Sequence, residues 1–276
     1  MKRVHWTMGL MTMVLVSAMS VPLNALNLGD GLVGYWPLNG SWNDVSGNHN
    51  NMTPGNGPTF TTGKFDEGAY FDGVNDYAVS TSQLALTDKN TFTASIWVRS
   101  TDAGLEEETC AQVLGDHPTT AYWTNATLHT GKPWVTPIEE RRYWSGWYAN
   151  GDSGYDNQWE IVGPQTAGPE EWTNMVGVWQ RQGSNVNVTL YVNGTSIQTR
   201  TSGLIKGGLV NSWAVLGNQC TLQSHSAYKG TIDDFAVWNR ALSSEEILAI
   251  SQGATIPEPL TISLLAGVIL CVVQRR

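Results

Sequence analysis

The stretch Tyr228–Ile247, YKGTIDDFAVWNRALSSEEI, decides the fold and has three parts in a fixed order. Its middle alternates as a β-strand, and we expect two faces of different character. One face should carry Ile232, Asp234, Ala236 and Trp238, and the other Thr231, Asp233, Phe235 and Val237. Asn239–Leu242 then turns the chain. The run SSEE that starts at Ser243 predicts a capping box, with Ser243 as N-cap, ahead of a short helix.

Two further segments predict strands with one apolar face. Val186–Val192 alternates most cleanly, with Val186, Val188, Leu190 and Val192 facing one way. The pair Asn193-Gly194 that follows it is typical of a two-residue hairpin turn. Phe92–Arg99 places Phe92, Ala94, Ile96 and Val98 on one face and Trp97 on the other.

The start of the chain predicts shorter elements separated by turn residues. We expect a first strand within Leu32–Leu38, a loop over Asn39–Pro58 that is rich in Asn, Gly, Ser and Pro, and a hairpin of Gly68–Phe71 with Tyr77–Ser80. Many short strands with almost no helical period are typical of an all-β sandwich.

Five other segments accompany the closing stretch in a fixed order: GLVGYWPLNGSWNDVSGNHN (31–50), GKFDEGAYFDGVNDYAVS (63–80), FTASIWVRS (92–100), EWTNMVGVWQ (171–180) and VNVTLYVNGTSIQTR (186–200). Together they resemble laminin G-like, concanavalin A-like jelly-roll domains of the bacterial type. The resemblance covers most of Gly31–Ser251 and departs from the family over roughly 115–165. It implies an all-β, concanavalin A-like jelly-roll sandwich of two antiparallel sheets over residues 26–255, with one short C-terminal helix. A fold of this kind hosts several functions, so it does not fix one.

The N-terminal segment predicts export. Residues 1–25 have a basic start, then an apolar run over residues 8–19, then small residues. This order is typical of a secretory signal peptide with cleavage after Ser20 or Ala25. An uncleaved membrane anchor is the alternative, and the apolar run is short for a full span.

The C-terminal segment, residues 256–276, has an unusual order. Pro257-Glu258-Pro259 precedes an apolar run over residues 260–273 and two terminal arginines. It resembles the PEP C-terminal (PEP-CTERM) sorting tail of Gram-negative bacteria. That resemblance implies an exosortase-type processing enzyme as a partner, and the cell surface or extracellular matrix as the destination. A plain C-terminal anchor is the alternative, and in either case the tail lies in the inner membrane, transiently or permanently.

Charge excludes one class of partner. The chain has a formal net charge of −9, and removing the four basic residues and one acidic residue of the two end segments leaves −12. Such a domain repels nucleic acid and anionic lipid, since both are polyanions. We therefore expect no nucleic-acid partner, and membrane contact only through the C-terminal tail.

Cysteines allow one disulfide bond in the exported domain. Cys110 and Cys220 are its two cysteines, because Cys271 lies in the tail. An oxidising compartment permits a bridge, but pairing requires the two Cα atoms within about 7 Å. Two buried free thiols are the alternative.

The segment that departs from the family is dense in aromatic residues. The candidate ligand-binding side chains are Trp123, Trp144, Trp147, Tyr148 and Trp159. Flat aromatic faces among polar neighbours are suited to stacking against sugar rings, so a glycan or another extracellular polymer is the expected partner. The alternative is that these side chains only fill the core and rim of the sandwich.

An early loop suggests a metal site. Asp44–Asn50, DVSGNHN, offers oxygen donors at alternate positions with a glycine between them, as Ca²⁺ sites require. Comparable jelly rolls hold a structural Ca²⁺ with this loop and the first aspartate of the closing strand. The resemblance thus implies Asp44 and Asp233 as ligands, with Asn48, Asp72 and Asp234 as weaker candidates.

Catalysis has little support in the sequence. Glycoside hydrolysis needs two carboxyl groups about 5–9 Å apart. Related hydrolases carry them as Glu-x-Asp-x-x-Glu on one strand, and that motif does not occur here. Glu160 is the only isolated glutamate beside aromatic residues. The sequence therefore predicts a non-catalytic, calcium-stabilised binding module; a structural envelope or exopolymer protein is the alternative, and a glycoside hydrolase is third.

Overall fold

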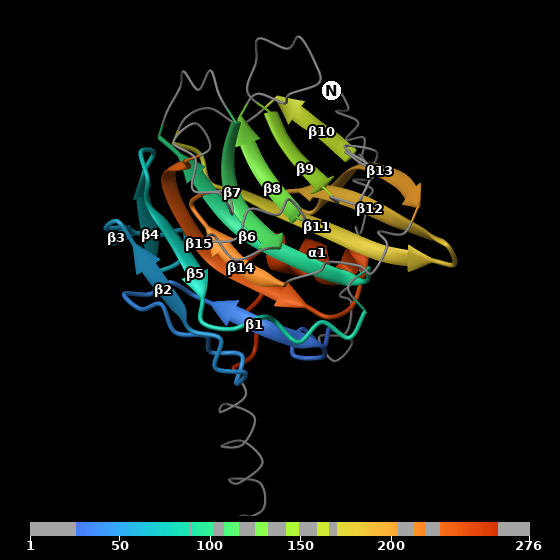
Figure 1. Cartoon of the computed structure of the whole chain (residues 1–276), viewed down its shortest axis with the longest axis horizontal. Coiled ribbons are helices and arrows are strands. Elements are labelled where there is room, and N and C mark those ends of the chain that lie inside the picture. The colour runs from blue at the N-terminus through green and yellow to red at the C-terminus, as the bar shows by residue number, and fades with distance from the viewer. Residues whose placement is uncertain are drawn as a thin grey trace, which may run out of the picture.

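The computed structural model describes residues 26–88, 90–101, 108–115, 125–131, 142–148, 159–165, 170–203, 212–218 and 227–258. Their strands form two antiparallel sheets that face each other (Figure 1). Sheet A contains β1 (Leu32–Trp36), β3 (Thr59–Thr62), β4 (Glu67–Asp72), β6 (Phe92–Ser100), β11 (Thr173–Gln182), β12 (Asn185–Val192), β13 (Thr195–Gly203) and β15 (Lys229–Trp238). Sheet B contains β2 (Met52–Gly55), β5 (Tyr77–Ser80), β7 (Glu108–Gly115), β8 (Asn125–Gly131), β9 (Arg142–Tyr148), β10 (Trp159–Gln165) and β14 (Trp213–Leu216).

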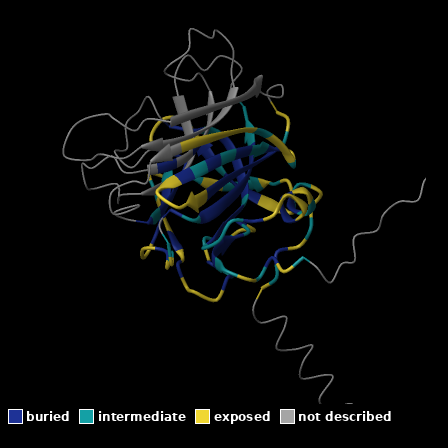
Figure 2. Cartoon of the chain, turned by 90° about the vertical axis from the view of Figure 1, so that its right-hand side faces the viewer, coloured by how far each residue is buried: buried dark blue, intermediate teal, exposed yellow. Residues whose placement is uncertain are grey.

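The main core lies between the two sheets, and buried residues concentrate in this part of the molecule (Figure 2). Phe92 stacks on Trp179 at a centroid distance of 4.6 Å, and Trp36 stacks on Phe235 at 5.1 Å. The apolar faces predicted for β6 and β12 are confirmed, since both face this core. Burial of these large rings is the main source of stability, at about 25 cal/mol for each Å² removed from water. The predicted two-sheet sandwich is therefore the observed fold.

A second core covers the outer face of sheet A. Helix α1 (Ser244–Ser251) places Ile247 and Ile250 on Val176 of β11 and on Ala236 and Trp238 of β15. The predicted capping box is confirmed, because Ser243 accepts from the backbone N–H of Glu246 while the Glu246 carboxylate accepts from that of Ser243. In the part of the chain described, no helix has the length and apolar character needed to cross a membrane.

The strict alternation predicted for β15 is wrong, because a β-bulge interrupts it. Asp233 pairs with Trp97 of β6, but the next pair is Ala236 with Ser95, so β15 holds one extra residue. Asp234 occupies that position with φ of 45°. The bulge moves the side chains after it to the opposite faces. The face toward the main core therefore carries Ile232, Phe235 and Val237, and the outer face carries Thr231, Asp233, Ala236 and Trp238.

Two predictions near the N-terminus are also wrong. The strands expected to form a hairpin, β4 and β5, belong to different sheets, since β4 pairs with β3 and β15 while β5 pairs with β2 and β14. The turn between them crosses from sheet to sheet, held by a hydrogen bond from the Asp72 N–H to Asp76. The segment Asn39–Pro58, expected to be entirely loop, contains the strand β2. Its first residue, Met52, is buried in the main core.

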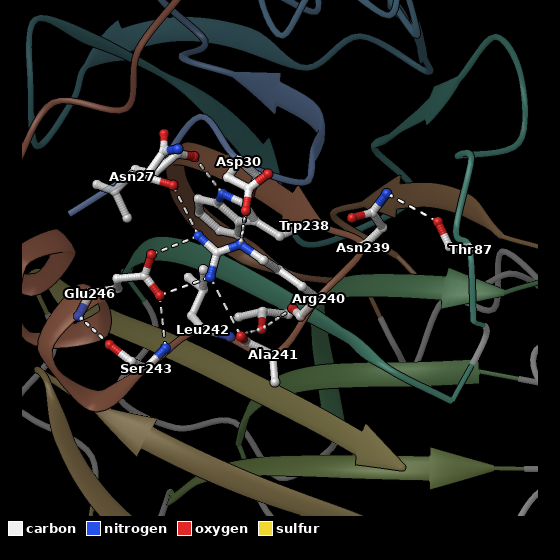
Figure 3. Close-up of polar contacts among 12 residues, drawn as sticks. Asn27, Asp30, Thr87, Trp238, Asn239, Arg240, Ala241, Leu242, Ser243 and Glu246 are labelled. Atoms are coloured by element: carbon white, nitrogen blue, oxygen red, sulfur yellow. Dashed lines mark hydrogen bonds and ion pairs between the residues drawn. The ribbon is translucent and has the colours of Figure 1, made fainter. Parts of the chain in front are cut away.

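Arg240, just after β15, ties the N-terminal segment to α1 (Figure 3). Its guanidinium donates to the backbone carbonyls of Asn27 at 3.0 Å and Asp30 at 2.7 Å. It also makes a bidentate pair with the Glu246 carboxylate, at 2.6 and 2.8 Å. The neighbouring Trp238 indole donates to the carbonyl of Leu28 at 2.7 Å. One side chain therefore joins the N-terminal segment to the start of α1, more than 200 residues later in the sequence.

We expect Arg240→Met to lower the free energy of unfolding by about 2 kcal/mol, because it leaves the mostly buried Glu246 carboxylate without its cation. Equilibrium urea unfolding followed by tryptophan fluorescence measures this. Arg200→Met is the matched control on exposed β13 and should change stability by less than about 0.5 kcal/mol. Equal losses in the two variants would show that the contacts of Arg240 contribute nothing.

Candidate functional site

The structure places four of the five candidate ligand-binding aromatic residues on adjacent strands of sheet B. Trp144, Trp147 and Tyr148 lie in β9, and Trp159 begins β10. In the register of this pair Trp147 stands opposite Trp159, and Trp144 stands opposite Val162. Trp123 lies outside the described residues. The backbone thus brings together aromatic positions that are up to 15 residues apart in the sequence.

Asp44 lies in the loop after β1, and its carboxylate organises that loop. The side chain is 6% exposed. Its Oδ1 accepts from the backbone N–H of Tyr35 at 3.0 Å and of Ser46 at 2.8 Å, and its Oδ2 accepts from that of Asn50 at 2.8 Å. Asn48, by contrast, is exposed and donates to the carbonyl of Leu32. Asp44 therefore accepts from two amide groups of its own loop and from one of β1.

Asp233 makes the equivalent contacts with a different loop. The residue is fully buried in the bulge of β15. Its Oδ2 accepts from the backbone N–H of Lys64 at 2.7 Å and of Phe65 at 2.9 Å, and its Oδ1 from that of Asp234. These bonds fix the turn between β3 and β4 on the outer face of sheet A. The sequence prediction missed this role, because nothing local to Asp233 indicates which distant turn it meets.

Tyr35 connects the two regions. Its backbone N–H donates to Asp44, and its hydroxyl donates to the Asp234 carboxylate at 2.8 Å. Burial raises the pKa of Tyr35 further above its ordinary value, with additional contributions from Asp234 and Asp233. Tyr35 pairs with Ala236 of β15, and this pairing places it beside the bulge.

The described donors do not fit a calcium shell in which Asp44 and Asp233 both take part. A carboxylate offers about four lone-pair positions, and backbone N–H groups occupy three of them on each residue. The weaker candidates are engaged as well, since Asp72 accepts from Val74 N–H and Asp234 from the Tyr35 hydroxyl. Within the described ranges, no group of three or more His, Cys, Asp or Glu side chains could hold a metal ion. Calcium binding stays a prediction.

Burial gives the bulge unusual acid–base properties. Desolvation raises the pKa of Asp233 from 3.8 to about 7, although the amide of Phe65 opposes the shift. The charge of Asp234 raises it further. Desolvation also raises the pKa of Asp234 to about 6, against the hydrogen bond from Tyr35. Burial therefore shifts the titration of these two adjacent carboxyl groups toward neutral pH.

The predicted disulfide stays a prediction. Cys110 lies in β7, with its Cα paired with that of His129 of β8. Cys220 lies outside the described residues, as do the predicted signal peptide and all but the first three residues of the C-terminal segment.

A family model described as Laminin_G_3, concanavalin A-like lectin/glucanases superfamily, matches residues 71–248. A comparison with curated protein sequences finds no match. Among solved structures, domain 4 of AbnA, a GH43 extracellular arabinanase from Geobacillus stearothermophilus in complex with arabinotriose, is similar with a TM-score of 0.58 and 18% identity. The similarity covers 80% of this chain and 98% of that one.

Two toxin domains are also similar. The binding domain of Paraclostridial Mosquitocidal Protein 1 has a TM-score of 0.59 and 16% identity, over 81% of this chain and 52% of that one. The receptor-binding domain of botulinum neurotoxin type G has a TM-score of 0.58 and 13% identity, over 81% of this chain and 51% of that one. The chain thus spans about half the length of these toxin domains. At such low identity the likeness concerns the fold.

We expect the free energy of unfolding to fall as the pH rises from 5 to 8 in the presence of EGTA. Asp233 has a folded pKa above its unfolded value of 3.8, so its contribution is complete below that value and is lost as the pH rises through about 7. Urea unfolding at several pH values measures the fall.

Asp233→Asn should reduce this fall, although it lowers stability at pH 5, because the amide –NH₂ cannot accept from the Asp234 N–H. The exposed Glu67→Gln is the control and should keep the fall. A pH profile unchanged by Asp233→Asn would contradict the assignment.

Proposed function

The chain belongs to the Laminin_G_3 family of the concanavalin A-like lectin/glucanases superfamily, and from this we propose that it is a non-catalytic binding module for a glycan or another surface polymer. One observation carries the proposal. Trp147 of β9 and Trp159 of β10 stand opposite each other in register, with Trp144 and Tyr148 on the same strand as Trp147. Sugar rings stack on aromatic faces, so adjacent aromatic positions on a rigid sheet suit a glycan.

The similar structures support the same class of ligand without defining it. The arabinanase domain, which matches this chain over nearly its whole length, was solved with arabinotriose bound. The two toxin domains are, by name, binding and receptor-binding domains. Binding rather than catalysis is therefore the function that these relatives have in common with our proposal.

Several contacts favour binding over hydrolysis. Hydrolysis needs one carboxyl group free to protonate the leaving group and a second free to attack or to activate water. The carboxylates of Asp44 and Asp233 are instead occupied by backbone amides, and that of Asp234 by the Tyr35 hydroxyl. Glu160, the isolated glutamate in the aromatic segment, lies in β10 opposite Gly146.

The second candidate is a structural envelope or exopolymer protein without a discrete ligand site. Tryptophan as core filling favours it, because Trp36, Trp179 and Trp238 are fully buried here. In that case the aromatic residues of β9 and β10 would contribute to stability and not to binding.

We further propose an exported location, at the cell surface or in extracellular matrix. The basis is the N-terminal segment with its signal-peptide order and the PEP-type tail, on which an exosortase-type enzyme would act.

The binding proposal predicts that Trp144→Ala or Trp147→Ala weakens retention on the glycan that the wild-type protein selects from an array. Loss of one stacked ring should weaken binding by about tenfold or more. Circular dichroism and thermal unfolding must show an intact fold in the same samples. If the variants unfold and the wild-type protein shows no detectable glycan binding, the result favours the structural candidate.

Thermal unfolding tests the structural calcium that the family resemblance implies. The resemblance implies Asp44 and Asp233 as ligands, with Asn48, while the amides on both carboxylates oppose it. A bound ion raises the melting temperature in Ca²⁺ over that in EGTA, and Asp44→Ala and Asp233→Ala should each remove the difference. Equal melting temperatures in Ca²⁺ and EGTA would mean that hydrogen bonds alone hold these loops.

A further inference from the structure

Three Asn-Gly pairs lie between described strands, and the fold holds two of them more firmly than the third. They are Asn39-Gly40, Asn56-Gly57 and Asn193-Gly194; a fourth, Asn150-Gly151, lies outside the described residues. In such a pair the backbone nitrogen of the glycine can attack the side-chain carbon Cγ of the asparagine, because glycine has no Cβ to obstruct the approach. Both groups must rotate to meet, so contacts that fix either of them slow the reaction.

The pair Asn193-Gly194 is fixed on both sides. Asn193 Oδ1 accepts from the backbone N–H of Asn174 at 2.9 Å, and the Asn193 N–H donates to the Asn174 carbonyl at 2.9 Å. Asn174 is fully buried. Gly194 is packed against α1, because a Cβ on it would meet Ser251 and would lie 3.0 Å from Leu248 Cδ1. The reaction therefore needs local opening of the β12–β13 hairpin.

The pair Asn39-Gly40 is exposed, but both of its reacting groups are engaged. Asn39 Oδ1 accepts from the backbone N–H of Glu67 at 3.0 Å. The Gly40 N–H, which carries the attacking nitrogen, donates to the Leu38 carbonyl at 3.0 Å. Exposure alone therefore does not make an Asn-Gly pair reactive in this fold.

The pair Asn56-Gly57 lacks these restraints. It lies between β2 and β3, where the chain crosses from sheet B to sheet A, and both residues are exposed. A Cβ on Gly57 would meet no atom within 4 Å. Among the described residues, the Gly57 N–H and Asn56 Oδ1 have no hydrogen-bond partner. Asn56 Nδ2, the nitrogen that leaves in the reaction, donates to the carbonyl of Asn75 at 2.8 Å.

We propose that Asn56 is a site of spontaneous deamidation, at which the folded protein forms aspartate and isoaspartate while Asn39 and Asn193 stay intact. Hydroxide removes the Gly57 amide proton, and the nitrogen forms a bond to Asn56 Cγ. The Cγ–Nδ2 bond breaks, and the nitrogen takes up a proton from water and leaves as ammonia. A second water then opens the cyclic imide at either carbonyl.

The modification removes a contact between two crossings of the sandwich. A carboxylate cannot donate to the Asn75 carbonyl, so the product loses the bond that joins the β2–β3 crossing to the turn between β4 and β5. It also adds one negative charge to an acidic chain. The site is independent of the proposed binding function, because it involves no residue of β9 or β10.

Peptide mapping by mass spectrometry tests the site after the purified full chain is incubated at mildly alkaline pH in H₂¹⁸O. Only product that contains ¹⁸O is counted, which excludes deamidation before the incubation. We expect Asn56 in the folded protein to react about tenfold or more faster than Asn39 and Asn193, and to give isoaspartate as well as aspartate. In concentrated urea the three rates should converge, because the restraining contacts are gone.

Asn56→Gln is the matched variant, since its longer side chain must close a larger ring. It should leave position 56 unreacted and the rates at Asn39 and Asn193 unchanged. Equal rates at the three pairs in the folded protein, or a difference between them that persists in urea, would overturn the proposal. Aspartate without isoaspartate would overturn it as well, because direct hydrolysis of the side-chain amide forms no cyclic imide.

Discussion

The structure depends on the buried carboxylate of Asp233, which joins the turn between β3 and β4 to the bulge in β15. Among the described strands, β15 has the most pairing partners. β15 pairs with β1, β4 and β6, so a displacement there reaches much of sheet A. A fully buried carboxylate is tolerated only if its oxygens are satisfied, and three backbone amides meet that need. The extra residue lets the strand contribute to the main core both before and after the bulge, while Ala236 and Trp238 on the outer face support α1.

Fold class followed from period-2 alternation, because β12 buries every second residue as a half-buried strand should, and alternate residues of β6 face the main core. Alternation failed at Asp233-Asp234, since a bulge arises from the contact with the Lys64–Phe65 turn, which is about 170 residues away. The β4–β5 hairpin failed for a related reason. An Asp- and Gly-rich turn indicates a change of direction, but both a hairpin and a crossing between sheets satisfy that chemistry.

Candidate site residues were harder to predict, because the same residue types serve structure and binding. Asp44 was chosen for its oxygen donors, and those donors hold the backbone of its own loop. The aromatic positions of β9 and β10 could be identified from composition, whereas their pairing needed the register.

The two ends of the described domain lie side by side. Leu28 and Ile256 share one apolar cluster, and a Cβ on Gly29 would be 3.9 Å from the Pro257 ring. A domain with adjacent ends can be inserted into a loop of another protein without stretching it, and its chain can be closed and reopened elsewhere. Gly57 and Gly183, in turns where an added Cβ meets no atom within 4 Å, are suitable positions for new ends. The fold therefore suits circular permutation, and Arg240 holds the N-terminal segment against α1.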